Sequence, residues 1–472
     1  MQNFLFTSDI FKGSRYEKGH PLDMDRVWPS VELVQLMGWI KNEQIIKNHP
    51  AETDELIKFH NLDYVNALKK AEEDQYLPEK LKRKFNIGIG NNPIFSEVFS
   101  RPATAARASI RAVEMISNKK AEKILNISGG THHGRKSQAY GFCFLNDCVL
   151  AILKAIELGF KEILYVDIDA HHCDGVQDTF VRNENVSIIS IHEKNRWPNT
   201  GLIEDSNIHN IVNFPVPENF NDKEMDFIIK NGVIPFAKTK KPDLLIIQAG
   251  ADMLDGDPQS RICLSNNAYW KAINDVLSLC KNVIILGGGG YNPYLTAKAW
   301  AGNWALLNNK VDLLDDIMKP ECYNLLKSLK CLFTSLNNFL WYASVLFILL
   351  TGFFSCEKTT DPPLSDITSI TISNLYAPQS GGQGQPISGE FKKFDFATGQ
   401  QTGSYTDWDI AFRGTSIIVN GGVSLGTVDE PNRSGQAAAY IVSGTFESVN
   451  EVNPNLLTQD SESGYAIATG SD

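Results

Sequence analysis

The chain has 472 residues and a formal net charge of −11, from 44 basic and 55 acidic side chains. This length has room for two or more domains, and the negative balance argues against general nucleic-acid binding, which depends on clustered Lys and Arg. The charge is also uneven, because residues 357–472 carry −9 and the preceding residues carry −2. The two parts of the chain are therefore expected to differ in kind.

The cysteines and histidines limit the chemistry of each part. The eight cysteines include no CxxC pair, and all nine histidines lie at or before His209. A disulfide framework is therefore not expected, any imidazole chemistry belongs to the first part, and that part is predicted to be cytoplasmic. The chain opens on "MQNFLFTSDIFKG", which turns polar within seven residues, so no secretory signal is predicted there.

Five short apolar runs in the first part predict parallel strands that are covered on both faces. They are the segments 123–128, 162–169, 187–192, 244–250 and 282–290. Apolar residues with helical spacing lie between them, at 146–160 and 267–279. We therefore predict an α/β domain with a doubly wound, mostly parallel sheet, whose ligands bind beyond the carboxyl ends of the strands.

Polar residues follow four of these runs directly. They are the segment "GGTHHG" (129–134), the charged residues of "DIDAHHCDG" (167–175), the segment "AGAD" (249–252) and the segment "GGGGY" (287–291). A single such segment is usually a turn or a hydrogen-bonded core residue. Since the carboxyl ends of parallel strands meet at one edge of a sheet, four of them together predict a functional site.

The spacing within "DIDAHHCDG" makes chemical sense as part of a metal site. Side chains two residues apart on an extended segment share a face, so Asp167, Asp169 and His171 can point the same way. Asp169 and His171, together with Asp252, would provide three protein ligands and leave an open position for water, as catalytic zinc sites require. Such oxygen-rich ligation is also compatible with Fe(II) or Mn(II).

The remaining polar residues supply acid-base groups for such a site. The adjacent His132 and His133 need carboxylates that fix their tautomers, and Asp167 and Asp174 are available for this. Tyr291, on its glycine-rich loop, offers a hydroxyl donor for a developing oxyanion.

A long uncharged stretch separates the two parts of the chain. The segment "FLWYASVLFILLTGFF" (339–354) has 16 residues without a charge, which is shorter than the roughly 20 residues of a spanning helix and near the upper end of a signal-peptide apolar region. The polar segment "EKTTDPPLSD" follows it. Beyond this, short alternating runs broken by Gly, Asn and Pro predict an all-β region.

Seven segments of the first part, in order, carry a family resemblance. They are "GHPLDMDR" (19–26), "FHNLDYVNAL" (59–68), "GGTHHG" (129–134), "YGFCFLNDCVLAI" (140–152), "LYVDIDAHHCDGVQDTF" (164–180), "QAGADMLDGDP" (248–258) and "LGGGGYN" (286–292). Over about residues 1–325, the chain resembles the zinc-dependent histone deacetylases and their bacterial relatives, the acetoin-utilisation and acetylpolyamine amidohydrolase proteins. The resemblance implies an arginase/deacetylase-like fold and hydrolysis of an acetyl-lysine peptide or a small acetylated amine.

The resemblance also implies roles for individual residues. Zinc would be bound by Asp169, His171 and Asp252, with His133 as general base and acid and His132 as its electrostatic partner. Asp167 and Asp174 would lie behind the histidine pair, and Tyr291 would polarise the acyl carbonyl. Substrate contacts would come from Asn91, Phe142, Trp197 and Gly289, of which Phe142 and Trp197 match the aromatic walls of the acyl-lysine tunnel. A structural potassium site would fall on Asp167, Asp169, His171, Ser190 and Ile191.

Two positions depart from the family pattern. Family members usually have Asp where this chain has Asn91, and that Asp grips the backbone amides of a peptide substrate. Asn lacks the charge that makes such bonds strong, so peptides are expected to bind weakly and a small acylated amine becomes more credible. The other departure is Cys173, which replaces the usual Gly and is expected to fill space.

Two other functions are compatible with the sequence. A ureohydrolase of the same superfamily, such as arginase or agmatinase, uses an Asp-Ala-His-x-Asp segment close to "DAHHCD" in a two-manganese site. It also needs a second Asp-x-Asp cluster, which "GADMLDGDP" does not space correctly. The other alternative, of a different class, is an envelope-anchored binding lipoprotein that acts through residues 357–472.

The second part, from about residue 331, resembles the N-terminal half of the haem-binding HmuY-type lipoproteins of the Bacteroidetes group, through "WDIAFRGTSIIVNGG" (408–422). The segment "LTGFFSC" would then be a loose lipobox with Cys356 lipidated. Haem is not expected, because that family ligates haem through later histidines and this chain has none beyond His209.

These expectations divide the chain into four regions. They are a deacetylase-like catalytic domain (1–328), a hydrophobic signal-like segment (329–356), a linker (357–370) and a truncated HmuY-like domain (371–472). A deacetylase of this kind is cytoplasmic, whereas a lipobox addresses the cell envelope. We hypothesise that the sequence joins two neighbouring genes, by genuine fusion or by an assembly error. The alternative is a deacetylase tethered to the membrane through 339–354.

Overall fold

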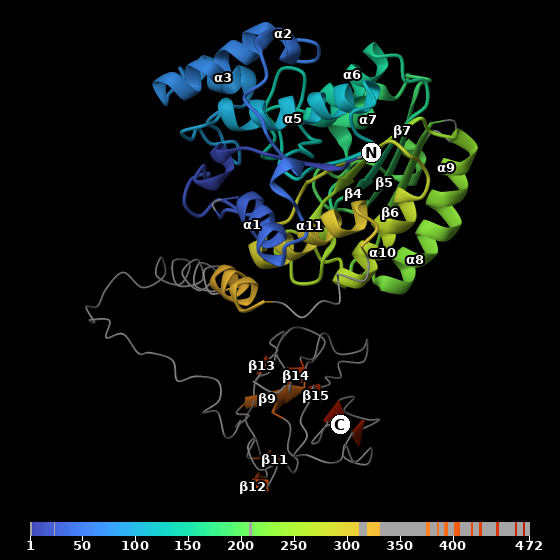
Figure 1. The fold of residues 1–472 in the computed structure, drawn as a ribbon. Helices are drawn as coiled ribbons and strands as arrows, with labels where there is room; N and C mark the ends of the chain where they lie inside the picture. The colour runs from blue at the N-terminus through green and yellow to red at the C-terminus, as the bar shows by residue number, and fades with distance from the viewer. Residues whose placement is uncertain are drawn as a thin grey trace. The chain divides into compact units, whose positions relative to one another are not determined.

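The computed structural model describes residues 2–22, 24–206, 210–310 and 319–330, and the backbone of nine short strands between residues 374 and 467. The predicted hydrophobic stretch 339–354, the lipidation candidate Cys356 and the linker 357–370 lie outside the described residues. The chain divides into two units, Met1–Leu350 and Thr351–Asp472, and each is described by itself (Figure 1).

An eight-stranded, fully parallel sheet forms the centre of the first unit, in the order β2-β1-β3-β8-β7-β4-β5-β6. The strands are β1 (Phe4–Thr7), β2 (Ile45–Lys47), β3 (Lys123–Asn126), β4 (Ile163–Ile168), β5 (Val186–Glu193), β6 (Ile211–Val216), β7 (Leu244–Ala249) and β8 (Val283–Leu286). The five predicted strands are confirmed as β3, β4, β5, β7 and β8, and the prediction of a parallel α/β sheet is confirmed with them. The prediction missed β1, β2 and β6. The first two are short, and β6 is an edge strand that contains Pro215, as edge strands tolerate.

Helices cover both faces of the sheet, as the doubly wound prediction requires. One face packs against α1 (Val27–Met37), α8 (Asp222–Ile228), α9 (Ile234–Lys240), α10 (Asn266–Leu277) and α11 (Pro293–Leu307). The other packs against α5 (Ser100–Ser117), α6 (Asp147–Glu157) and α7 (Asp174–Phe180). The helices predicted at 146–160 and 267–279 are confirmed as α6 and α10. Alternate residues of β4 serve the two faces, so that Val166 joins the first core and Tyr165 the second.

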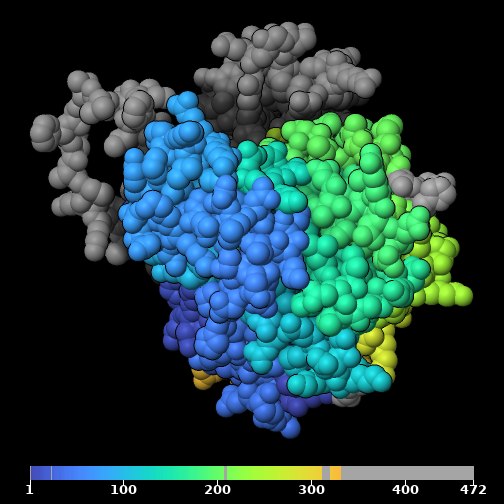
Figure 2. Space-filling view, turned by 90° about the horizontal axis from the view of Figure 1, so that it is seen from above, coloured from blue at the N-terminus to red at the C-terminus, as the bar shows by residue number. Residues whose placement is uncertain are grey.

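Three further helices form an outer cluster beside α5. They are α2 (Thr53–Leu56), α3 (Leu62–Asp74) and α4 (Glu79–Phe85), which bury Leu56, Tyr64 and Phe85 against the side of α5 that faces away from the sheet. Figure 2 shows the N-terminal hundred residues, in blue, on one side of the face in view and the residues around β4 to β6, in green, on the other. This division follows from the strand order, in which β1 and β2 lie at one end of the sheet and β6 at the other.

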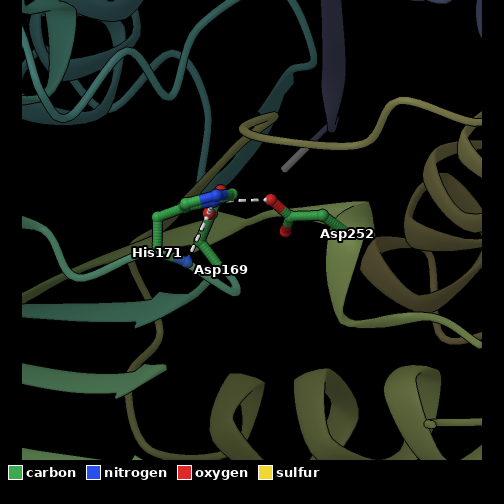
Figure 3. A group of neighbouring side chains, drawn as sticks. All are labelled: Asp169, His171 and Asp252. Atoms are coloured by element: carbon green, nitrogen blue, oxygen red, sulfur yellow. Dashed lines mark hydrogen bonds and ion pairs between the residues drawn. The ribbon is translucent and has the colours of Figure 1, made fainter. Parts of the chain in front are cut away.

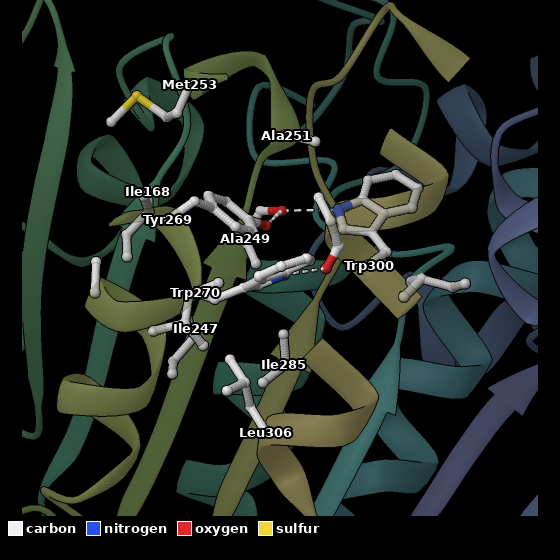
Figure 4. Close-up of a cluster of buried hydrophobic side chains, with 14 of the residues drawn as sticks. Ile168, Ile247, Ala249, Ala251, Met253, Tyr269, Trp270, Ile285, Trp300 and Leu306 are labelled. Carbon is white, nitrogen blue, oxygen red and sulfur yellow. Dashed lines mark hydrogen bonds between the residues drawn. The ribbon is translucent and has the colours of Figure 1, made fainter. Parts of the chain in front are cut away.

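The end of β7 is held by the core helices. The carbonyl of Ala249 accepts hydrogen bonds from the Tyr269 hydroxyl of α10 at 2.8 Å and from Trp300 Nε1 of α11 at 2.9 Å (Figure 4). Both aromatic side chains are buried, and a buried carbonyl needs such partners. The short turn that follows, Ala251–Met253, therefore starts from a fixed point.

The second unit is described only as short strands. They are β9 (Asn374–Ala377), β10 (Gln385–Pro386), β11 (Phe391–Phe394), β12 (Gln401–Tyr405), β13 (Ile417–Ile418), β14 (Ser424–Gly426), β15 (Tyr440–Val442), β16 (Thr458–Gln459) and β17 (Ala466–Ile467). They pair in small antiparallel sheets. The HmuY-like all-β domain over 371–472 stays a prediction. Within the described part of the chain, no helix has both the length and the apolar character needed to cross a membrane.

Candidate functional site

Four neighbouring strands deliver the predicted site residues to one edge of the sheet. The strands β3, β8, β7 and β4 lie side by side, although they come from distant parts of the sequence. Their carboxyl ends lead into residues 127–134, 287–292, 250–254 and 169–174. The expected convergence of the four polar segments is therefore present in the structure.

Asp169, His171 and Asp252 form a buried group whose three candidate ligand atoms all lie within 4.8 Å of one another (Figure 3). His171 Nδ1 lies 3.1 Å from Asp169 Oδ1 and 3.0 Å from Asp252 Oδ2. It is the only such metal-ligating group of three or more residues found among the described residues. Two carboxylate oxygens and one imidazole nitrogen are ligands that zinc accepts.

Backbone and side-chain donors fix the two carboxylates. Asp169 Oδ2 accepts from Gln248 Nε2 and from the Gly289 backbone N–H, both at 2.7 Å, and Asp252 Oδ1 accepts from the Ala170 N–H at 3.0 Å. A Cβ added at Gly289 would lie 2.0 Å from Asp252 Oδ2, so only glycine fits there. Gly289, predicted to contact substrate, thus binds one candidate metal ligand and leaves room for the other.

The electrostatics of this group favour a cation. Burial lowers the pKa of His171, but hydrogen bonds to Asp169 and Asp252 and the charges of these two residues outweigh it and raise the pKa to about 10. Burial and the charge of Asp169 raise the pKa of Asp252 to about 6. Two carboxylates that share one site repel each other unless positive charge lies between them. The donor set and its charge therefore fit a divalent metal ion.

The two adjacent histidines are each paired with a buried carboxylate. His132 Nδ1 lies 2.8 Å from Asp167 Oδ2, and His133 Nδ1 lies 2.7 Å from Asp174 Oδ1. Their Nε2 atoms are 3.0 Å apart, so at most one of the two nitrogens acts as donor at a time. The pairing fixes both rings and directs their Nε2 atoms toward the same place.

The two rings differ in basicity. Burial lowers the pKa of His132, but the charges of Asp167 and Asp169 raise it to about 9. Burial and the charge of His132 lower the pKa of His133 to about 3, against the opposing effect of Asp174. His133 is therefore the ring that is held neutral, and its Nε2 is the acceptor of the pair.

An open pocket of about 440 Å³ leads to these residues. His133, His171 and Tyr291 line it together with the predicted aromatic walls Phe142 and Trp197. The rings of Trp197 and His133 lie edge to face at 4.6 Å between centroids, and those of Phe142 and Tyr291 at 5.9 Å. Aromatic rings thus line the pocket next to His171 of the candidate metal group. Gly289 lies beside a smaller cavity of about 70 Å³.

The remaining predicted residues are the rim residue Asn91 and the potassium-site candidates of β4 and β5. Asn91 is exposed and lines the pocket, and its backbone carbonyl lies 3.1 Å from His20 Nε2. Ser190 and Ile191 of β5 lie opposite Asp167 and Ile168 of β4. Asp167 Oδ1 is fully buried and has no hydrogen-bond partner among the described residues. A buried oxygen of this kind needs a partner, and a monovalent cation would supply one.

The sequence prediction missed four residues that support the site. Tyr165 donates its hydroxyl to Asp167 Oδ2 at 2.6 Å, Arg135 pairs with Asp174, and Gln248 bonds Asp169. Asp257 bonds the backbone of Tyr291. A signal existed for Tyr165 and Gln248, because each is a polar residue inside an otherwise apolar run and points to the same face as a site residue.

Comparisons with known proteins agree with this geometry. A family model described as histone deacetylase domain matches residues 20–307. Histone deacetylase RPD3 of Saccharomyces cerevisiae is 30% identical over 316 residues, which cover 65% of this chain and 72% of the yeast protein. Histone deacetylase 1 of Homo sapiens is 30% identical over 291 residues, which cover 60% of each protein.

Two solved structures are similar to the first unit. A crystal structure of an HDAC homologue from Aquifex aeolicus aligns with a TM-score of 0.62 at 31% identity, over 70% of this chain and 100% of that one. A structure of an HDAC homologue complexed with SAHA aligns with the same values.

Proposed function

The chain belongs to the histone deacetylase family and is a hydrolase of the deacetylase type, and from this we propose that it removes an acetyl group from a lysine side chain or a small amine in a zinc-dependent reaction. The observation that carries the proposal is that His133, His171 and Tyr291 line one pocket. His171 belongs to the group Asp169–His171–Asp252, and His133 belongs to one of two adjacent His–Asp pairs.

The proposed reaction is hydrolysis of an amide by water. A zinc ion held by Asp169, His171 and Asp252 would polarise the water and the acyl carbonyl. His133 takes the proton from the water at Nε2, because its Nδ1 is held by Asp174 at 2.7 Å. The same nitrogen then returns a proton to the leaving amine.

Two other groups stabilise the charge that develops. Tyr291 donates its phenol hydrogen to the oxyanion, and burial with the charges of Asp252 and Asp169 raises its pKa well above 10, which keeps the hydroxyl protonated. His132 provides a positive charge beside His133. Phe142 and Trp197 line the pocket and would shield the acyl chain from water.

A structural potassium ion is part of the proposal. Its support is the buried Asp167 Oδ1, which lacks a hydrogen-bond partner among the described residues, and the position of Ser190 opposite Asp167 on β5. Potassium accepts carboxylate, hydroxyl and carbonyl oxygens, so these groups suit it.

The deciding experiment assays the zinc-loaded full-length chain on acetyl-lysine peptides, N-acetylputrescine and longer acyl-lysines. Release of acetate with one bound zinc per chain is the expected result. No turnover of any of these substrates, with metal bound, contradicts the deacetylase proposal. Two manganese ions per chain would instead support the ureohydrolase alternative.

The location and the second unit remain proposals. We propose that residues 1–328 act in the cytoplasm and that residues 339–354 and Cys356 attach the chain to the cell envelope. The alternative is that two neighbouring genes are joined near residues 325–331. Resequencing of the locus and one full-length band on a blot would refute an assembly error. Cell fractionation with and without residues 339–356 tests membrane attachment, and a binding function of residues 357–472 requires that attachment.

A further inference from the structure

A buried carboxylate outside the group described above joins two loops of the site. Asp257 lies in the loop that follows the metal-ligand candidate Asp252, and its side chain is 5% exposed. Its Oδ2 accepts hydrogen bonds from the backbone N–H of Tyr291 at 2.6 Å and of Asn292 at 3.2 Å. Its Oδ1 accepts from the backbone N–H of Gln259 at 2.9 Å.

These bonds connect the two loops that carry pocket residues. Tyr291 follows the glycine-rich segment after β8, whereas Gln259 follows β7, and both line the same pocket. A second contact supports the connection, since Asn292 Nδ2 donates to the Gly256 carbonyl at 3.3 Å. Gly256 has a φ of +88°, a conformation that favours glycine and turns Asp257 toward the Tyr291 loop.

Other contacts hold the glycine segment before Tyr291, since Arg26 donates to the carbonyls of Gly288 and Gly290 at 2.8 Å and the Gly289 N–H donates to Asp169. Asp257 instead binds the N–H groups of Tyr291 and Asn292 themselves. Four glycines precede Tyr291, and Gly288 and Gly290 have φ values of +149° and +134°, so the segment has more backbone freedom than one with side chains. A carboxylate that accepts two adjacent N–H groups at the start of α11 restricts this freedom directly at Tyr291.

We propose that Asp257 is a positioning residue that sets the place of the Tyr291 hydroxyl relative to the metal ligands, and that it does so through the Tyr291 backbone rather than through the substrate. This inference rests on the proposed function, since it assigns Tyr291 the role of oxyanion donor. A misplacement of a reacting group by about 1 Å can cost on the order of a hundredfold in rate.

Asp257→Asn is the informative variant. The variant keeps the size of the side chain, but an NH₂ group replaces one of the two carboxylate oxygens. This group then faces a backbone N–H donor that the oxygen had accepted from. We expect kcat on an acetyl-lysine peptide to fall by about tenfold or more, with KM and bound zinc unchanged, because a misplaced donor weakens transition-state stabilisation and leaves ground-state binding intact.

A double-mutant cycle with Tyr291→Phe separates positioning from a general structural role. If Asp257 acts through the Tyr291 hydroxyl, Asp257→Asn changes kcat by less than about threefold once that hydroxyl is absent. An equal loss in both backgrounds, or no loss in the wild-type background, overturns the proposal. The matched control is Asp255→Asn, an exposed carboxylate in the same loop, which should behave as wild type.

Two further measurements keep the test decisive. If Asp257→Asn loses its near-UV circular dichroism, Asp257→Ser is used, and failure of both variants to fold overturns the proposal because the residue then serves the fold. The same cycle is repeated with the affinity for SAHA, a hydroxamate whose carbonyl stands in for the acyl carbonyl. If wild type binds SAHA but hydrolyses no acyl substrate, the proposed function fails. The role of Asp257 is then decided from the SAHA affinities of the four proteins in the cycle alone. Absence of SAHA binding by the zinc-loaded wild type counts against both.

Discussion

The buried histidine His60 should make the stability of the first unit depend on pH. Its side chain is 1% exposed. Its Nδ1 lies 3.1 Å from the Arg135 carbonyl, and its Nε2 accepts a hydrogen bond from the Asn146 N–H at 3.0 Å. Only the neutral ring with its hydrogen on Nδ1 satisfies both contacts. Burial accordingly lowers the pKa of His60 from 6.5 to about 3.

The size of the effect follows from this difference. Below pH 6.5 the unfolded chain binds a proton at His60 while the folded chain does not, so stability is lost as the pH falls through this range. At pH 5 the loss amounts to about 2 kcal/mol relative to neutral pH, and it continues to grow until the pH reaches about 3. The side-chain amide of Asn146 also donates hydrogen bonds to the carbonyls of His132 and Gly134. Protonation of His60 should therefore loosen the loop that carries His132 and His133.

The assay compares urea unfolding of wild type and His60→Gln by tryptophan fluorescence at pH 5 and pH 7.5. Gln provides a donor and an acceptor but does not titrate in this range. Wild type should lose about 2 kcal/mol more than the variant between the two conditions. The exposed His49 offers a matched control, His49→Gln. If His60→Gln and wild type lose the same stability, the reasoning about His60 is wrong.

Four more predictions concern the pocket. Tyr291→Phe should lower kcat by about a hundredfold or more without changing the zinc content measured by mass spectrometry; full activity would contradict the role of Tyr291. Asp252→Asn should lower bound zinc, after dialysis against dilute chelator, well below the wild-type content, and retention of a full equivalent would exclude Asp252 as a ligand. Gly289→Ala places a Cβ 2.0 Å from Asp252 Oδ2 and should weaken zinc affinity about tenfold or more. The control Gly13→Ala, with no atom within 4 Å of the added Cβ, should leave zinc affinity unchanged. Equal zinc affinity in the two variants would refute the steric argument. Asn91→Asp should lower KM for an acetyl-lysine peptide severalfold and leave KM for N-acetylputrescine unchanged, and equal effects on the two substrates would contradict a rim contact with peptide backbone.

The sequence predicted the part of the fold in which local pattern and tertiary environment agree. The central strands β4 and β7 are buried on both faces, so their apolar runs identify them without further information. The edge strand β6 contains Asn213 and Pro215 and is half-exposed at several positions, so its pattern is indistinct. The strand order could not be predicted, because it depends on how crossover helices return the chain and not on any single segment.

The site was predictable to the extent that its residues are ionisable. Asp169, His171 and Asp252 attract attention as charges next to apolar strands, where an unpaired charge is costly. Asp257 and Asn146 act through backbone N–H and carbonyl groups of distant loops, and such contacts have no sequence signal. They depend on loop conformation, including glycines with positive φ, which only the structure reveals.

The register of the central strands explains why so many polar groups can be buried together. Asp167 of β4 lies opposite Ser190 of β5 and Gln248 of β7, so three polar residues form one row across the sheet, directly beyond an apolar row that contains Val166, Ile189 and Ile247. Oδ2 of Asp167 is bonded by His132 and Tyr165, and Gln248 reaches across to Asp169. A shift of β4 by one residue would send Asp167 to the opposite face of the sheet and remove the partner of His132. The apolar core below this row therefore fixes the register on which the candidate acid-base and metal-binding groups depend.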